Sequence, residues 1–221
     1  MIMQLLYGLV GVLAVLTLQA ATLQADIVNA QGQGVADAIL ALTPQGAALP
    51  PLSALEPAVI LQKDRMFAPL VTVIRRGQAV RFPNEDRTRH HVYSVSQAKR
   101  FEIPLYARQE PPPVVFETAG VIVLGCNIHD HMLGYLFVLD APYFAKSDAS
   151  GRVTLPALPG GDYTVQVWHP GLKDYALAPE PLRLNPTETH NLSFTLKLRA
   201  MRLWQPKAES APTTDNDAAY E

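Results

Sequence analysis

The amino-acid sequence predicts an all-β protein. Short runs rich in Val, Leu and Ile follow one another along the chain, and turn-forming residues separate them at short intervals. No amphipathic helix longer than about two turns is evident, whereas a mean helix has about three. The 19 prolines and 8 tyrosines favour the same fold class. Strands and turns in such close succession are typical of β-sandwiches and barrels.

Composition narrows the class of protein. The chain has 221 residues, which is enough for one large domain or two small ones. It is 48% hydrophobic and 17% charged, with a net charge of −2. This balance indicates a globular protein. It lacks the basic bias of nucleic-acid binders, so we expect no nucleic-acid partner.

The N-terminus predicts export to the periplasm. An apolar run over Leu5–Leu18 has the length of a signal-peptide core and is short for a membrane span. Small residues follow, and cleavage after Ala25 would leave Asp26 at the start of a strand-like run. We therefore predict a signal peptide over 1–25 and no membrane span after cleavage. No Lys or Arg precedes the run, so an uncleaved anchor remains the alternative.

The pattern along the chain predicts the remaining elements in order. Residues 26–43 indicate two short strands around a Gly-rich turn, and 44–57 form a Pro-rich connection. Strand-like runs then follow at 58–62, 70–74, 78–82, 90–96, 113–117, 120–126 and 135–140.

A further unit begins with the turn sequence "SDASG". Apolar and polar residues alternate in the two runs that follow, 152–158 and 162–169. They alternate again in 190–199, where Leu192, Phe194, Leu196 and Leu198 share one face. Residues 200–221 are polar and without pattern, and we predict a disordered tail there.

The first and last units resemble the carboxypeptidase regulatory-like, or transthyretin-like, β-sandwich. The resemblance rests on "VNAQGQGVADAILAL" and "SDASGRVTLPALPGGDYTV" and covers some 70 residues. It implies one discontinuous sandwich made of 26–57 and 141–199, with a second β domain, 58–140, inserted into it. Two ordinary domains in series are the alternative.

The stretch "GCNIHDHMLGY", residues 125–135, gathers metal-binding side chains. It contains the only cysteine, Cys126, followed by His129 and Met132. In an oxidising compartment a lone cysteine has no internal disulfide partner. Copper electron-transfer sites use two imidazoles, one thiolate and a weak thioether. A second imidazole would come from His90 or His91, and only one of these neighbours in a strand can face the ion.

Residues 67–138 resemble the plastocyanin, pseudoazurin and amicyanin group of cupredoxins, here of the type labelled methylamine utilization protein. The resemblance rests on "VIRRGQAVRFPNED", on "FETAG" before the cysteine strand, and on Met132-x-Gly134 before an apolar strand. It implies a Greek-key β-sandwich that holds one copper ion, with the smaller regulatory-like sandwich formed by the flanking segments.

The resemblance also implies the ligand set. The copper ligands would be His90, Cys126, His129 and Met132. His91 stands where the family usually has an asparagine that braces the cysteine loop, so the resemblance does not extend to that brace. His131 has the Cys-x4-His spacing of azurin-like loops and is, with His91, the alternate ligand. Such extra histidines could give a green or red site in place of a blue one.

The implied function is outer-sphere electron transfer, not enzymatic catalysis. A redox protein such as a cytochrome or a dehydrogenase would be the partner. Zinc would accept Cys and His, but it has little use for a thioether. Two alternatives remain: copper capture or delivery in the periplasm, and a structural or binding sandwich whose insert is held together by the metal.

Overall fold

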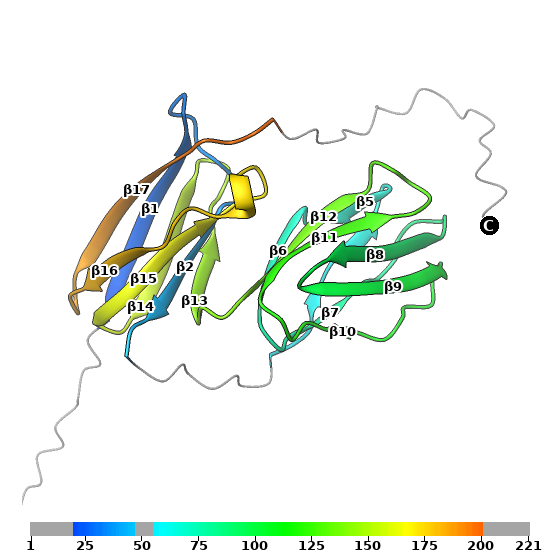
Figure 1. Ribbon diagram of the computed structural model, residues 1–221, viewed down its shortest axis with the longest axis horizontal. Helices are drawn as coiled ribbons and strands as arrows, with labels where there is room; N and C mark the ends of the chain where they lie inside the picture. Colours follow the sequence, from blue (N-terminus) through cyan, green and yellow to red (C-terminus); the bar gives the residue numbers. More distant parts are fainter. Residues whose placement is uncertain (1–19, 47–54, 201–221) are drawn as a thin grey trace, which may run out of the picture.

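The computed structural model describes residues 20–46 and 55–200. Within these ranges the regular structure is β apart from one short 3₁₀ turn, η1 (Lys173–Tyr175), and the all-β prediction is confirmed. No helix in this part of the chain is long and apolar enough to cross a membrane. Figure 1 shows the strands gathered into two sandwiches placed side by side.

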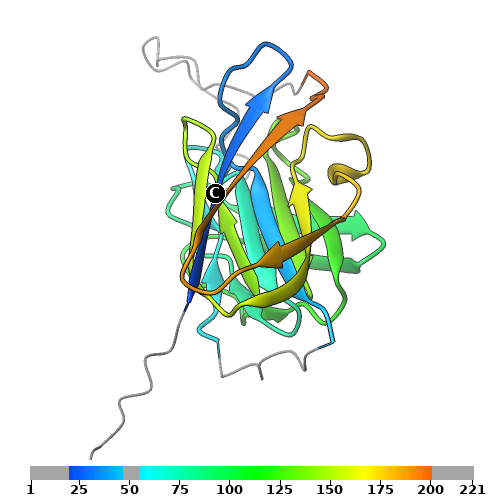
Figure 2. The same ribbon diagram turned by 90° about the vertical axis from the view of Figure 1, so that its left-hand side faces the viewer.

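One sandwich combines strands from the beginning and the end of the described chain. Its sheets have the orders β14-β1-β17 and β13-β2-β15-β16. The strands are β1 (Ala21–Asn29), β2 (Ile39–Pro44), β13 (Tyr143–Lys146), β14 (Arg152–Leu158), β15 (Gly161–Trp168), β16 (Glu180–Leu184) and β17 (Thr189–Leu196). β1 and β17 run parallel, and Figure 2 shows them side by side. The chain leaves this sandwich after β2 and returns to it at β13.

The other sandwich is built from the residues between these two points. Its larger sheet has the order β6-β12-β11-β8-β9 and its smaller sheet the order β10-β7-β3, with β4 and β5 as a separate hairpin. The strands are β3 (Ala58–Val59), β4 (Leu61–Lys63), β5 (Met66–Ala68), β6 (Val71–Arg75), β7 (Ala79–Arg81), β8 (His90–Ser96), β9 (Lys99–Tyr106), β10 (Val114–Val115), β11 (Gly120–Cys126) and β12 (Leu133–Leu139).

Each sandwich has its own apolar core. Side chains from alternate positions of β1, β2, β14, β15 and β17 form the first core, in which Leu196 is fully buried and Leu192 and Phe194 pack against it. The shared apolar face predicted for 190–199 is therefore confirmed. The second core includes the fully buried side chains of Phe82, Phe116 and Ile122, and it extends to Cys126.

The two sandwiches share an apolar contact. Ile39 of β2 lies in one buried cluster with Val71 of β6 and Phe137 of β12, and the Phe137 ring meets Trp168 edge-on at 6.1 Å between centroids. Beside this cluster, Lys146 Nζ donates to the Val71 carbonyl and to Asp37. The outer face of the larger sheet is thus covered where β6 and β12 meet the neighbouring sandwich.

β1 begins before the predicted cleavage position, Ala25. The strand expected to begin at Asp26 begins at Ala21. Ala21, Leu23 and Ala25 are buried in the first core, and the segment pairs with both β14 and β17. Cleavage after Ala25 would remove the first five residues of this central strand, so a processed chain that keeps β1 whole begins at or before Ala21. The apolar run and residues 201–221 of the predicted tail lie outside the described residues.

Candidate metal centre

Three of the predicted ligands meet at the ends of two paired strands. His90 is the first residue of β8 and Cys126 the last residue of β11. The strands pair antiparallel with Cys126 opposite Val92, which brings the start of one strand to the end of the other. His129 follows in the loop to β12. That loop turns back because the Met132 N–H donates to the His129 carbonyl over 2.9 Å.

The distances between the three donor atoms suit a small metal ion. Sγ of Cys126 lies 3.9 Å from Nδ1 of His90 and 3.7 Å from Nδ1 of His129. All three atoms lie within 4.8 Å of one another. First-row metals bind thiolate at about 2.3 Å and imidazole at about 2.0 Å. An ion between such ligands at about 120° separates sulfur and nitrogen by about 3.7 Å, so the observed spacing fits a near-trigonal site.

Met132, the fourth predicted ligand, is buried. It is 2% exposed and belongs to the same apolar cluster as Cys126. His90 is fully buried, whereas His129 is partly exposed. Of the three donor residues, His90 and Cys126 are therefore shielded from water, and the group reaches the surface through His129.

Asp86 sets the orientation of His90. Its Oδ2 lies 2.7 Å from Nε2 of His90, so a proton on Nε2 leaves Nδ1 as the ligand atom facing Cys126. The backbone N–H groups of Asp64 and Arg65 donate to the same carboxylate over 2.7 and 2.9 Å. Burial favours the neutral acid, but these donors and His90 outweigh it and hold the pKa of Asp86 below its ordinary value.

The surroundings of Cys126 lower the pKa of its thiol. Burial would raise its pKa, but the His90 ring and the backbone N–H groups of His91 and Ile128 outweigh burial and lower that pKa. The pKa of His90 is raised for the complementary reason, because Cys126 and Asp86 outweigh its burial. A thiolate is the form that binds soft metals, so the surroundings favour the metal-binding state.

The two alternate ligands lie outside the three-donor group. His91 sits on the opposite face of β8, where Nε2 lies 2.8 Å from Oε1 of Glu102 and its ring packs near Tyr93. The neighbouring histidines His90 and His91 therefore have different partners. The His131 ring lies 6.0 Å from that of His129, and burial lowers its pKa.

Sequence reasoning missed two supports of the site. The role of Asp86 was one, although its position four residues before His90 is a usable signal. The other is a buried group beside His90, where Tyr106 faces His90 in the β8–β9 ladder. Its hydroxyl donates to the Phe82 carbonyl over 2.6 Å and contacts the amide of Gln62. Burial raises the pKa of Tyr106 to about 12, so its hydroxyl keeps its proton.

Among proteins of known structure, parts of this chain are similar to copper proteins. No family model and no curated protein matches the chain. A mutant of amicyanin in its oxidised state matches at 19% identity over 38% of this chain and 82% of its own, with a TM-score of 0.35. A purple cupredoxin from Nitrosopumilus maritimus matches at 24% identity over 37% of this chain and 99% of its own, with a TM-score of 0.34.

A copper-containing nitrite reductase from Thermus scotoductus SA-01 also matches. It is 26% identical over 52% of this chain, with a TM-score of 0.36, and the match covers 28% of the reductase. These matches thus include cupredoxins and a larger copper enzyme. None of these three matches covers the whole of this chain, and they do not confirm the regulatory-like part of the predicted resemblance.

Proposed function

We propose that this protein is a mononuclear copper protein that carries electrons, and not an enzyme. The observation that carries the proposal is the buried arrangement of two Nδ1 atoms around the Cys126 sulfur, at 3.9 and 3.7 Å. Two imidazoles and one thiolate with a nearby thioether are the donors of copper electron-transfer sites. Copper, when bound, would supply a one-electron couple between Cu(I) and Cu(II).

The chain's own residues would keep the site nearly unchanged between the two oxidation states. His90 is held by Asp86, and Asp86 is held by two backbone N–H groups of the β4–β5 turn. Cys126 is held at the end of a paired strand. A rigid set of ligands needs little rearrangement when the charge of the ion changes. The buried Met132 would be the weak axial ligand that tunes the potential.

His129 would be the point at which electrons enter and leave. It is the one partly exposed member of the three-donor group. A partner would dock against the loop that carries it, without a substrate pocket. We propose a redox protein such as a cytochrome or a dehydrogenase, supported by the partly exposed position of this ring.

Export and domain division are part of the proposal. The apolar N-terminal run supports a periplasmic location, where the single thiol would remain available to metal. The pairing of β2 with β13 and β15 supports a copper domain, 58–140, inserted into the outer sandwich. In this arrangement the flanking sandwich fixes the outer face of the larger sheet of the copper domain.

The test is a visible absorption spectrum after addition of one equivalent of Cu(II). We expect an intense thiolate-to-copper band in the native protein, its loss in Cys126→Ser, and its retention in the control His131→Gln. No band in the native protein, or a band that survives in Cys126→Ser, would refute the site. Loss of the band in His131→Gln would transfer the ligand role to His131.

Voltammetry separates electron transfer from copper capture and delivery. A carrier gives a reversible couple and holds its copper against a chelator. A delivery protein gives a poorly reversible couple and gives up its copper readily. The buried, braced position of His90 favours the first outcome.

A further inference from the structure

The edge strands of the sheets differ in how they are protected against pairing with another chain. An exposed edge strand is normally kept from pairing with another chain by a proline, by charged side chains or by its short length. β14, β16 and β9 each contain a proline and at least one charged residue. β6 ends in Arg75 and β13 in Lys146, while β3 and β10 have two residues each.

β17 lacks all of these protections. Its eight residues, THNLSFTL, include neither proline nor Asp, Glu, Lys or Arg. It pairs with β1 on one side, and no strand of the described chain pairs with it on the other. Among the edge strands of the described sheets, β17 alone is longer than three residues and free of both proline and formal charge.

The backbone of β17 is aligned to accept another strand. The carbonyl of Glu188 accepts from Thr22 of β1, and the two strands run parallel with Thr22 opposite Thr189. In a parallel pair alternate residues bond to the same neighbour. The N–H and C=O groups of the other set, which includes Asn191 and Ser193, are therefore directed to the open edge.

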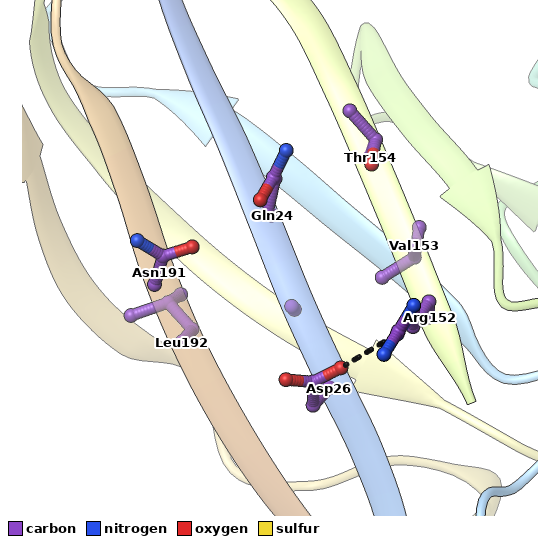
Figure 3. Close-up of a pocket in the computed structure, with 8 residues that line it drawn as sticks. Gln24, Asp26, Arg152, Val153, Thr154, Asn191 and Leu192 are labelled. Carbon is purple, nitrogen blue, oxygen red and sulfur yellow. Dashed lines mark ion pairs between the residues drawn. The ribbon is translucent and has the colours of Figure 1, made fainter. Parts of the chain in front are cut away.

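The side chains of β17 are compatible with those of a second copy. The outward face carries Asn191, Ser193 and Thr195, all exposed, and it continues a polar row across Gln24 and Thr154. Figure 3 shows Thr154, Gln24 and Asn191 on three adjacent strands. The inward face carries Leu192 and Phe194, which pack on the core but remain partly exposed.

Antiparallel pairing about a two-fold axis at Ser193 places apolar side chains opposite apolar ones and polar side chains opposite polar ones. Each Leu192 then faces Phe194 of the second copy, and each Asn191 faces Thr195. Cross-strand pairs of apolar residues, and pairs of hydroxyl or amide side chains, stabilise a sheet. No two like charges oppose each other, because the first charged residue past the strand, Lys197, faces Thr189. The strand is thus complementary to itself in charge and polarity.

We propose that β17 is the dimerisation edge of this protein, and that it pairs antiparallel with β17 of a second copy about Ser193. The two β14-β1-β17 sheets then form one continuous six-stranded sheet. Pairing buries the exposed parts of Leu192 and Phe194 and satisfies the open backbone groups of both copies. The copper domain takes no part in this contact, so the dimer is independent of metal loading.

Sedimentation velocity tests the proposal from about 1 µM to about 100 µM, a range in which ordinary protein association is visible. We expect the native protein to reach twice the mass of one chain. Ser193→Lys places two ammonium groups face to face at the axis and should weaken the dimer by about tenfold or more. Thr154→Lys makes the same change on the same face but away from the seam, and should leave the dimer intact.

A monomer at every concentration, or a dimer that survives Ser193→Lys, would overturn the proposal. A monomer that instead binds extended foreign peptides would assign this edge to another partner.

A cross-link tests the register without relying on Ser193→Lys. Opposed residues of an antiparallel pair have Cα atoms about 4.5–5.5 Å apart, within disulfide range. Ser193→Cys should therefore form a disulfide dimer with oxidised glutathione, whereas Thr154→Cys should stay monomeric in a non-reducing gel. Equal cross-linking of both variants, or none at Ser193→Cys, would refute pairing at this position.

Discussion

Asp86→Asn tests how the protein prepares His90 for metal. The carboxylate is 14% exposed, so water screens its contacts little. It accepts from the N–H groups of Asp64 and Arg65 and lies 2.7 Å from Nε2 of His90. The asparagine is nearly the same size but carries no charge, and its amide nitrogen cannot accept a hydrogen bond. The substitution therefore removes the charged partner of the ring while preserving the packing.

The expected magnitude follows from this contact. Loss of a group that orients a metal-binding histidine typically lowers metal affinity by about 10- to 100-fold, which corresponds to about 1.4–2.8 kcal/mol. The two backbone N–H groups lose charge-assisted hydrogen bonds at the same time, so the metal-free protein should also lose about 1–3 kcal/mol of unfolding free energy.

Copper affinity can be measured by competition with a chromogenic Cu(I) chelator, and stability by urea unfolding of the metal-free protein. Glu85→Gln is the matched control. It removes one carboxylate from the neighbouring residue, which pairs with Lys63 over 3.4 Å while both side chains are more than half exposed, so we expect a change of less than about 0.5 kcal/mol. Equal copper affinity in the two variants would show that Asp86 does not orient His90.

Three further outcomes follow from the packing. Phe137→Ala, at a fully buried position between the sandwiches, should cost about 3–5 kcal/mol in urea unfolding; a loss below about 1 kcal/mol would contradict tight packing there. Burial lowers the pKa of His169, whose Nδ1 accepts from a backbone N–H. Its stabilising contribution is thus present above about pH 6.5 and lost as pH falls, so Tm should drop less between pH 7 and 5 in His169→Gln than in the control His190→Gln. Mass spectrometry of the exported protein should place its N-terminus at or before Ala21; a fully folded product beginning at Asp26 would contradict the role of β1.

The strands were predictable where strand-forming residues follow one another between turns. The runs at 90–96 and 120–126 coincide with β8 and β11, because Val, Ile and Tyr favour strands and residues of this kind recur in both runs. β9, β13 and β16 were not predicted. They are edge strands whose charges and prolines protect the open side and at the same time hide the strand pattern. Their place in the fold depends on the neighbour they pair with.

The sequence by itself determined the fold class and the local donor set. The alternation of short apolar runs allows little besides β structure, and Cys126, His129 and Met132 are brought close by a loop of seven residues. Only the tertiary structure decided which distant group completes the set. His90 lies 36 residues before Cys126, and a one-residue shift in the β8–β11 register would turn His91 towards the sulfur instead. That register depends on how whole strands bury their side chains, which no local pattern contains.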